Sequence, residues 1–302
     1  MLTTPLSPDH WYFTETSAHQ RDVLWSVFGP ALLDCSWSPA NTPAWPEHIQ
    51  ADLLAHIPKP PTYHSPRLGF KFEQLWQSWL TECQWPFYAN VQIHDAKRTL
   101  GELDLLVQIP NTHAPADRHS VAETQHWELA LKFYLGHHDE WIGPNRQDLL
   151  SRKLRHLQQH QLTISKHPAA RQQLTDLHAQ PNQHLAIMRG CLFQAINPAL
   201  QATLPAEVSD HHWQGFWCHQ QDAQHYLPLA HWFILAKDQW LSLALAPCAI
   251  DTNELLHYLG RHFDYLNVGL CLARVVPCRT GWAEQERWFI MPNHWPLQAG
   301  KS

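Results

Sequence analysis

The clearest hydrophobic pattern along the chain lies in residues 66–82, where apolar side chains recur at the three- and four-residue spacing of one helix face. The stripe consists of Phe72, Leu75, Trp76, Trp79 and Leu80. Ser65 is a typical N-cap and Pro66 is favoured at a first helical position, so we expect the helix to begin at Pro66. Glu73 falls on the flank of the stripe, beside the surface that the helix covers.

Three strand-like runs follow the helix, and they cover residues 87–95, 99–109 and 126–135. A long polar loop joins the last two runs. A second helix is expected to begin at Pro144 or Asn145 and to reach residue 160, because its leucines cluster on one side at about 100° per residue. Residues 184–196 read as a further strand. The predicted order is therefore helix, three strands, helix, strand.

Both flanks of this segment also carry periodic patterns. A helix is expected over residues 16–34, and the last hundred residues suggest a helix and several strands: 215–219, 229–236, 253–263 (the helix), 269–277 and 287–296. We find no linker that would divide the chain. The prediction is one α/β domain over residues 1–302, with a core at 66–196, an N-terminal helical extension and an α/β C-terminal elaboration at 197–302 of uncertain role.

Composition excludes several classes of protein. The N-terminus lacks the basic start and apolar run of a secretory signal, and no stretch approaches the roughly 18 apolar residues of a membrane span. The seven cysteines are scattered without a CxxC pair, which argues against a disulfide framework and a zinc ribbon. No P-loop or dinucleotide fingerprint occurs. We expect a cytoplasmic protein that neither spans a membrane nor uses a nucleotide cofactor.

Charge is distributed unevenly. The chain has a formal net charge of −6, yet residues 146–173 hold six basic side chains and one acidic one. A basic segment on an acidic body favours weak, salt-dependent nucleic-acid binding confined to one face.

Charged side chains inside the strand-like runs point to chemistry. Alternate residues of a strand share a face, so Glu102 and Asp104 point one way in the second run, as do Glu128 and Lys132 in the third. If the two strands pair, carboxylates from both converge with a lysine beside them. Grouped carboxylates suit Mg²⁺ or Mn²⁺, and the lysine would orient water or stabilise charge on a phosphate. The alternative is a salt-bridged sheet face without a catalytic role.

These features together resemble the PD-(D/E)XK phosphodiesterase superfamily of nucleases. The resemblance rests on the helix with Glu73, the "GELDLL" strand with Asp104 and the "ELALK" strand ending in Lys132. More closely, the whole chain is similar to a bacterial family of about 300 residues with no established activity. The superfamily resemblance implies a restriction-endonuclease-like core, a metal site at Asp104 and a second acid, and a catalytic Lys132.

The chain departs from the superfamily motif at one position. The second acid is expected two residues before the lysine, where this chain has Ala130, and Glu128 stands four residues before it. A bulge near Ala130 could shorten the gap, or Glu73 could supply the missing ligand from its helix. The third alternative is a decayed site.

The second predicted helix adds a basic stripe. Arg146, Lys153 and His160 recur every seven residues along the edge of its apolar face, where they would contact a nucleic-acid backbone. The free N–H groups at the helix start near Asn145 could hold an anion as well. A solvated helix flank is the competing interpretation. A zinc site at His211, His212, Cys218 and His219 matches no known ligand spacing.

Two functional hypotheses follow. The first is a metal-dependent nuclease acting on DNA, with RNA as the second choice, in which Asp104 with Glu128 or Glu73 holds Mg²⁺ or Mn²⁺ and Lys132 positions the attacking water. The second is a catalytically inactive relative that serves as a nucleic-acid or protein interaction module. The inactive form should bind no Mg²⁺ and should pair Asp104 with Lys132.

Overall fold

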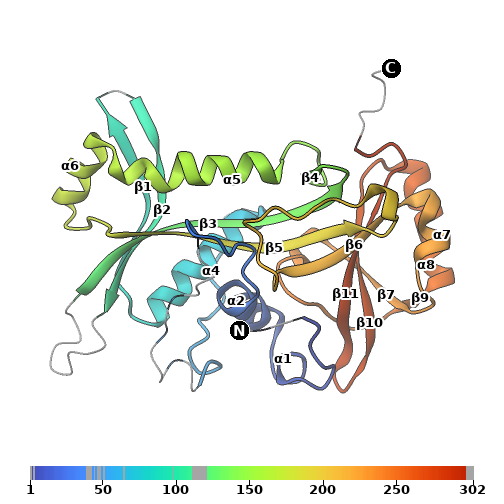
Figure 1. The fold of residues 1–302 in the computed structure, drawn as a ribbon. Helices are drawn as coiled ribbons and strands as arrows, with labels where there is room; N and C mark the ends of the chain where they lie inside the picture. Colours follow the sequence, from blue (N-terminus) through green and yellow to red (C-terminus); the bar gives the residue numbers. More distant parts are fainter. Residues whose placement is uncertain are drawn as a thin grey trace.

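One mixed β-sheet organises the chain, as the computed structural model shows for residues 2, 4–38, 43, 45, 49, 52–63, 65–96, 98–110 and 121–296 (Figure 1). Within these residues eleven strands join a mostly antiparallel sheet, ordered β1-β2-β3-β5-β6-β11-β10-β7-β9, with β4 paired to β3 and β8 to β11. The strands are β1 Phe87–Asp95, β2 Arg98–Pro110, β3 Val121–His137, β4 Glu140–Ile142, β5 Gln183–Ala195, β6 Trp213–His219, β7 His231–Leu235, β8 Leu245–Ala246, β9 Ile250–Asp251, β10 Leu270–Cys278 and β11 Gly281–Met291.

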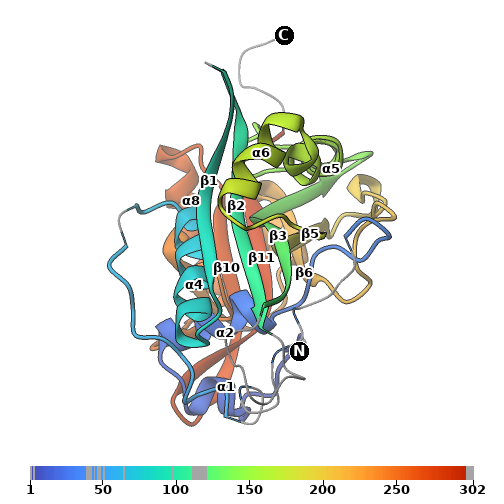
Figure 2. The ribbon, with the colours of Figure 1, turned by 90° about the vertical axis from the view of Figure 1, so that its left-hand side faces the viewer.

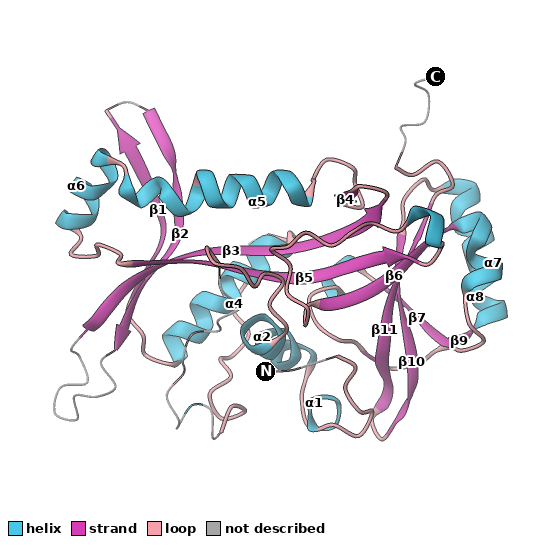
Figure 3. Ribbon diagram, viewed as in Figure 1, coloured by secondary structure: helices cyan, strands magenta, loops and turns pink. Residues whose placement is uncertain are grey.

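Helices cover both faces of the sheet (Figures 2 and 3). They are α1 Trp11–Thr14, α2 Ala18–Phe28, α4 Leu68–Glu82, α5 Leu150–Gln159, α6 Pro168–Asp176, α7 Ala223–Tyr226 and α8 Thr252–Tyr265, and the short 3-10 helix η1 Gln161–Lys166 joins α5 to α6. Figure 2 shows α4 on one side of β1 and β2, with α5 and α6 on the other. No helix in these described segments is both long and apolar enough to cross a bilayer.

The central segment follows the predicted order of elements. After α4, β1, β2 and β3 pair antiparallel in succession, and β5 returns parallel to β3 after α5. A parallel partner requires a crossover connection, which α5, η1 and α6 supply. The strand predicted at 87–95 is confirmed residue for residue, whereas β3 extends beyond its predicted ends.

Both predicted helix starts in this segment are wrong. α4 begins at Leu68 with Arg67 as its N-cap, because the Ser65 hydroxyl accepts the Arg67 N–H in a local turn instead of capping the helix. α5 begins at Leu150, since Leu149 is extended and forms a bridge with Ile142. The anion site predicted at the helix start near Asn145 is therefore absent, because that residue lies in a turn.

Two hydrophobic layers fix the helices to the sheet. The predicted α4 stripe is buried, and it packs with α2 into the main core against one face of β2, β3 and β5. On the opposite face, Leu150, Leu154 and Leu157 of α5 cover Ala130 of β3 and Met188 of β5. Strand β3 is thus enclosed between helices, which explains why its sequence is apolar on both faces.

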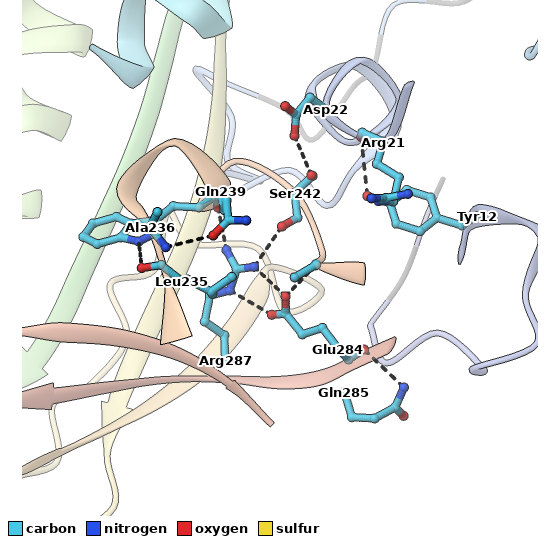
Figure 4. Close-up of polar contacts among 12 residues, drawn as sticks. Tyr12, Arg21, Asp22, Leu235, Ala236, Gln239, Ser242, Glu284, Gln285 and Arg287 are labelled. Carbon is cyan, nitrogen blue, oxygen red and sulfur yellow. Dashed lines mark hydrogen bonds and ion pairs between the residues drawn. The ribbon is translucent and has the colours of Figure 1, made fainter. Parts of the chain in front are cut away.

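The C-terminal elaboration continues the same sheet. β6 pairs parallel to β5 and β11 parallel to β6, so the last strands extend the central segment. Polar contacts then tie this part to the N-terminal helix (Figure 4). The buried Arg287 of β11 donates to the carbonyl of Ser242 at 2.8 Å, and the Ser242 hydroxyl donates to Asp22 of α2 at 2.6 Å.

Candidate functional site

The candidate site forms where the sheet opens around Asp104. The pairing of β2 with β3 stops at Leu105 and Trp127, one residue short of Asp104. On the other side, strand β1 pairs with β2 on both sides of Asn90 but not at Asn90 itself, whose φ of 53° is in the left-handed region. The Asp104 carboxylate fills this opening and accepts the Leu129 backbone N–H at 2.8 Å. The acid therefore lies directly beside the start of the "ELALK" run.

Two neighbouring side chains, those of His126 and Gln161, hold the buried Glu128 in place. The Glu128 side chain is 1% exposed. Burial lowers the pKa of His126 to about 4, and its Nε2 forms a hydrogen bond of 2.8 Å with Glu128 Oε1. The Gln161 amide, from η1, donates to Glu128 Oε2, and its own oxygen accepts from Lys153 Nζ at 2.9 Å. Both carboxylate oxygens are thus occupied.

Three carboxylates share this environment. Burial is the first cause that raises the pKa of Glu73, Asp104 and Glu128, each to about 7. Repulsion adds to it, because the charge of Glu128 raises the pKa of Asp104, and the charges of both raise that of Glu73. The site joins α4, β2 and β3, and we call these three residues the acid cluster. The raised pKa values mean that these acids change protonation state near neutral pH.

Lys153 is a cation that acts on two of the three acids, Asp104 and Glu128. It is half-buried on α5; burial and then repulsion by Lys132 lower its own pKa, while the charges of Glu128 and Asp104 raise it. In return, the charge of Lys153 lowers the pKa of both acids. Attraction between Lys153 and the two acids offsets only part of the burial penalty.

The chemistry of the acid cluster suits a hard cation, because its donors are carboxylate oxygens. The arrangement is not that of a formed metal site: in the described part of the chain, no three His, Cys, Asp or Glu side chains are placed to hold a metal ion. An incoming ion would have to replace the contacts that His126 and Gln161 make with Glu128.

Lys132 forms an ion pair of its own, although it lies near enough to Lys153 for its charge to lower the pKa of that lysine. The partner of Lys132 Nζ is Asp148, at 2.5 Å, in the loop before α5. The register between β3 and β5 is regular from Gln125 to Leu135, so the bulge proposed near Ala130 is absent and does not bring Lys132 towards Glu128. The Asp104–Lys132 pair expected of an inactive relative is not among the ion pairs of the described residues either.

The predicted basic stripe is not a continuous helix edge. Arg146 precedes α5 in a turn, where it has a φ of 65° and its N–H bonds to the Gly143 carbonyl. His160 follows the helix as its C-cap, and its ring stacks on His156 with centroids 4.9 Å apart. Of the three predicted backbone contacts, only Lys153 lies within α5. The seven-residue spacing would place the three side chains on one edge only if a single helix ran from residue 144 to residue 160, whereas α5 covers Leu150–Gln159.

The histidines of the proposed zinc cluster have separate roles. His212 Nδ1 bonds to the Ser209 carbonyl at 2.6 Å, and His219 Nε2 bonds to the Trp295 carbonyl at 2.7 Å. These contacts stabilise the ends of β6.

Two residues of the site were missed from sequence. His126 shares a strand face with Glu128, two positions away, and this spacing could have revealed it. Gln161 had no comparable signal, because its contact depends on η1 turning back over β3. Lys153 was predicted to contact a nucleic-acid backbone, not to act on the acids.

Comparison with known proteins gives one match. A protein-family model described as "Domain of unknown function (DUF1853)" matches residues 21–291. No curated protein and no solved structure matches the chain. The matched range includes the whole acid cluster and the C-terminal strands.

Proposed function

The chain belongs to the DUF1853 family, and we propose that it is a metal-dependent, nuclease-like phosphodiesterase acting on DNA, with RNA as the second choice of substrate. The single observation that carries the proposal is the convergence of Glu73, Asp104 and Glu128 at an opening in the sheet, with their pKa values raised to about 7. Buried carboxylates without enough compensating charge are costly, and they concentrate at functional sites.

The arrangement of the central segment supports this proposal. α4, the antiparallel strands β1, β2 and β3, helix α5 and the parallel strand β5 follow the order implied by the sequence resemblance to PD-(D/E)XK enzymes. We therefore assign a restriction-endonuclease-like core to residues 66–196 as part of the proposal. The acids come from α4, β2 and β3, with Glu128 and Glu73 in place of the acid that the superfamily motif has at the position of Ala130.

In this proposal the acid cluster holds Mg²⁺ or Mn²⁺. Such an ion would supply Lewis-acid stabilisation of a phosphoryl oxygen and a more acidic water. Asp104, Glu128 and Glu73 would give it oxygen ligands. In the reaction a water oxygen bonds to phosphorus while the bond from phosphorus to one sugar oxygen breaks. The water gives up one proton and the leaving oxygen takes one up, so one water is consumed per bond.

Calorimetric titration of Mn²⁺ and Mg²⁺ tests the metal site. Binding in the micromolar to millimolar range is expected for the unmodified protein, and it should be lost in Asp104→Ala and Glu128→Ala. Glu82→Ala is the matched control, because Glu82 is an exposed acid at the end of α4. Equal binding by all four proteins, or none by the unmodified one, would contradict the proposal.

Cleavage is measured on the same proteins. Supercoiled plasmid and labelled single-stranded oligonucleotides are incubated with Mn²⁺, with and without a chelator. We expect chelator-sensitive cleavage that disappears in both cluster variants and persists in Glu82→Ala.

A second candidate function is a non-catalytic module that binds nucleic acid or protein. It is favoured by one observation, the full occupation of the Glu128 carboxylate by His126 and Gln161. A module of this kind should bind DNA in a salt-dependent way without Mg²⁺, and Asp104→Ala should leave that binding unchanged.

A further inference from the structure

Strand β3 carries Glu128 of the acid cluster, and the position two residues later is Ala130, which is buried against Leu154 and Leu157 of α5. A long cationic side chain has no room at position 130. The candidates for an ammonium group at the acid cluster are then Lys132, further along β3, and Lys153 of α5, whose charges repel each other.

We infer that Lys153 of α5, and not Lys132 of β3, is the lysine that contacts the reacting phosphate. The inference rests on the proposed phosphodiesterase function. It assigns the charge-stabilising role to Lys153 on α5, the helix that packs on β3. Lys153 directly precedes Leu154, one of the leucines of that packing.

The contacts of Lys153 carry this assignment. Its Nζ donates to Gln161 Oε1 at 2.9 Å, and the amide nitrogen of the same Gln161 donates to Glu128. Gln161 thereby holds the ammonium group and the second acid at one place. The charge of Lys153 also lowers the pKa of Asp104 and of Glu128, so its ammonium group lies within electrostatic range of both acids.

Lys132 is committed to a different contact. It pairs with Asp148 at 2.5 Å, and both side chains are partly open to solvent, at 28% and 36%. The pair joins β3 to the loop that leads into α5. The ion pair therefore holds the start of α5 against β3.

The chemical role of Lys153 follows from where charge develops. As the water oxygen bonds to phosphorus and the bond to the leaving sugar oxygen breaks, negative charge grows on the phosphoryl oxygens. An ammonium group fixed in a partly buried site stabilises that charge more than it would in water. Lys153 keeps its proton throughout, so the proton balance of the hydrolysis is unchanged.

Matched methionine variants test the inference, because methionine keeps the apolar stem and removes the charge. Lys153→Met, Lys132→Met and Lys153→Arg are compared with the unmodified protein in single-turnover cleavage of a labelled DNA duplex with Mn²⁺. Mn²⁺ affinity is measured by calorimetry on each, and thermal melting verifies that each is folded.

We expect Lys153→Met to slow cleavage by about 100-fold or more, with Mn²⁺ affinity preserved. Lys153→Arg should recover part of the rate, and Lys132→Met should slow cleavage by less than about tenfold. An equal loss in both methionine variants, or a larger loss in Lys132→Met, overturns the inference alone. If the unmodified protein shows no metal-dependent cleavage, the proposed function is overturned, and this inference with it.

Discussion

At the scale of residues, the acid cluster is a conflict between burial and charge. When Glu73, Asp104 and Glu128 are all ionised, they carry three negative charges, and Lys153 supplies one positive charge against them. Burial and this excess of negative charge together raise the pKa values of the three acids. The raised pKa values have a consequence for stability that does not depend on any assumed activity.

Asp104→Asn should stabilise the protein more at pH 8 than at pH 5. Burial raises the pKa of Asp104 to about 7 from an ordinary 3.8, so the folded form holds its proton where the unfolded chain has lost it. Stability from this proton is present in full below pH 4 and is lost as the pH rises through 7. Asparagine stays neutral and can still accept the Leu129 N–H.

The expected gain at pH 8 is roughly 1–3 kcal/mol in the free energy of unfolding, measured by urea denaturation at both pH values. Glu82→Gln, which changes an exposed acid of α4, should show no such difference between the two pH values. The same gain for Asp104→Asn at pH 5 and pH 8 would contradict the burial of this carboxylate.

At the scale of elements, the site depends on an interruption in β1. Asn90 is exposed, and its left-handed conformation leaves Asp104 without a regular partner in the β1–β2 ladder. Asparagine tolerates this conformation better than most residues. Its side chain also donates to Glu102 at 3.0 Å. The left-handed conformation of Asn90 in β1 thus interrupts the ladder opposite Asp104 in β2.

Asn90→Val should therefore destabilise the protein by about 1–2 kcal/mol, because β-branched residues are strained in the left-handed region. Asn90→Gly, which removes the same amide but permits the conformation, should be close to neutral. Chemical denaturation distinguishes the two. If valine and glycine had equal effects, the amide contact and not the backbone would explain the role of Asn90.

At the scale of the whole molecule, a polar network around one buried ion pair of β11 connects that strand to helix α2. Arg287 and Glu284 are each 0% exposed, with 2.5 Å between nitrogen and oxygen. Arg287 also lies over the Trp213 ring at 4.3 Å, and through Ser242 it reaches Asp22 of α2 (Figure 4). Lys71 of α4 completes the connection by donating to Asp22 at 2.6 Å.

Arg287→Met should cost about 3–5 kcal/mol, because it leaves the Glu284 carboxylate buried without its partner. The double variant Arg287→Met with Glu284→Gln should recover part of this loss, since no uncompensated charge remains. A double-variant cycle by urea denaturation measures the coupling. A cost below about 1 kcal/mol for Arg287→Met would mean that Glu284 is neutral or solvated in the folded protein.

The sequence by itself determined the order of the central elements and the identity of the acids. Helix and strand periodicities are local properties, so the α4 stripe and the strand at 87–95 could be predicted from neighbouring residues alone. Alternation along a strand likewise placed Asp104 and Glu128 on faces that could meet. Glu73 was identified as a possible third acid because its position on the helix flank is also a local property.

Only the tertiary structure decided which charges meet. The start of α5 depends on Leu149 pairing with Ile142, a contact that helix propensity does not anticipate. The pairing of Lys132 with Asp148 and of Lys153 with Gln161 depends on how α5 crosses β3. The C-terminal strands joined the same sheet through parallel pairing with β5, a long-range contact. Long-range packing selects among partners that are equally available to a local pattern, and for that reason the partners of Lys132 and Lys153 could not be assigned before the fold was known.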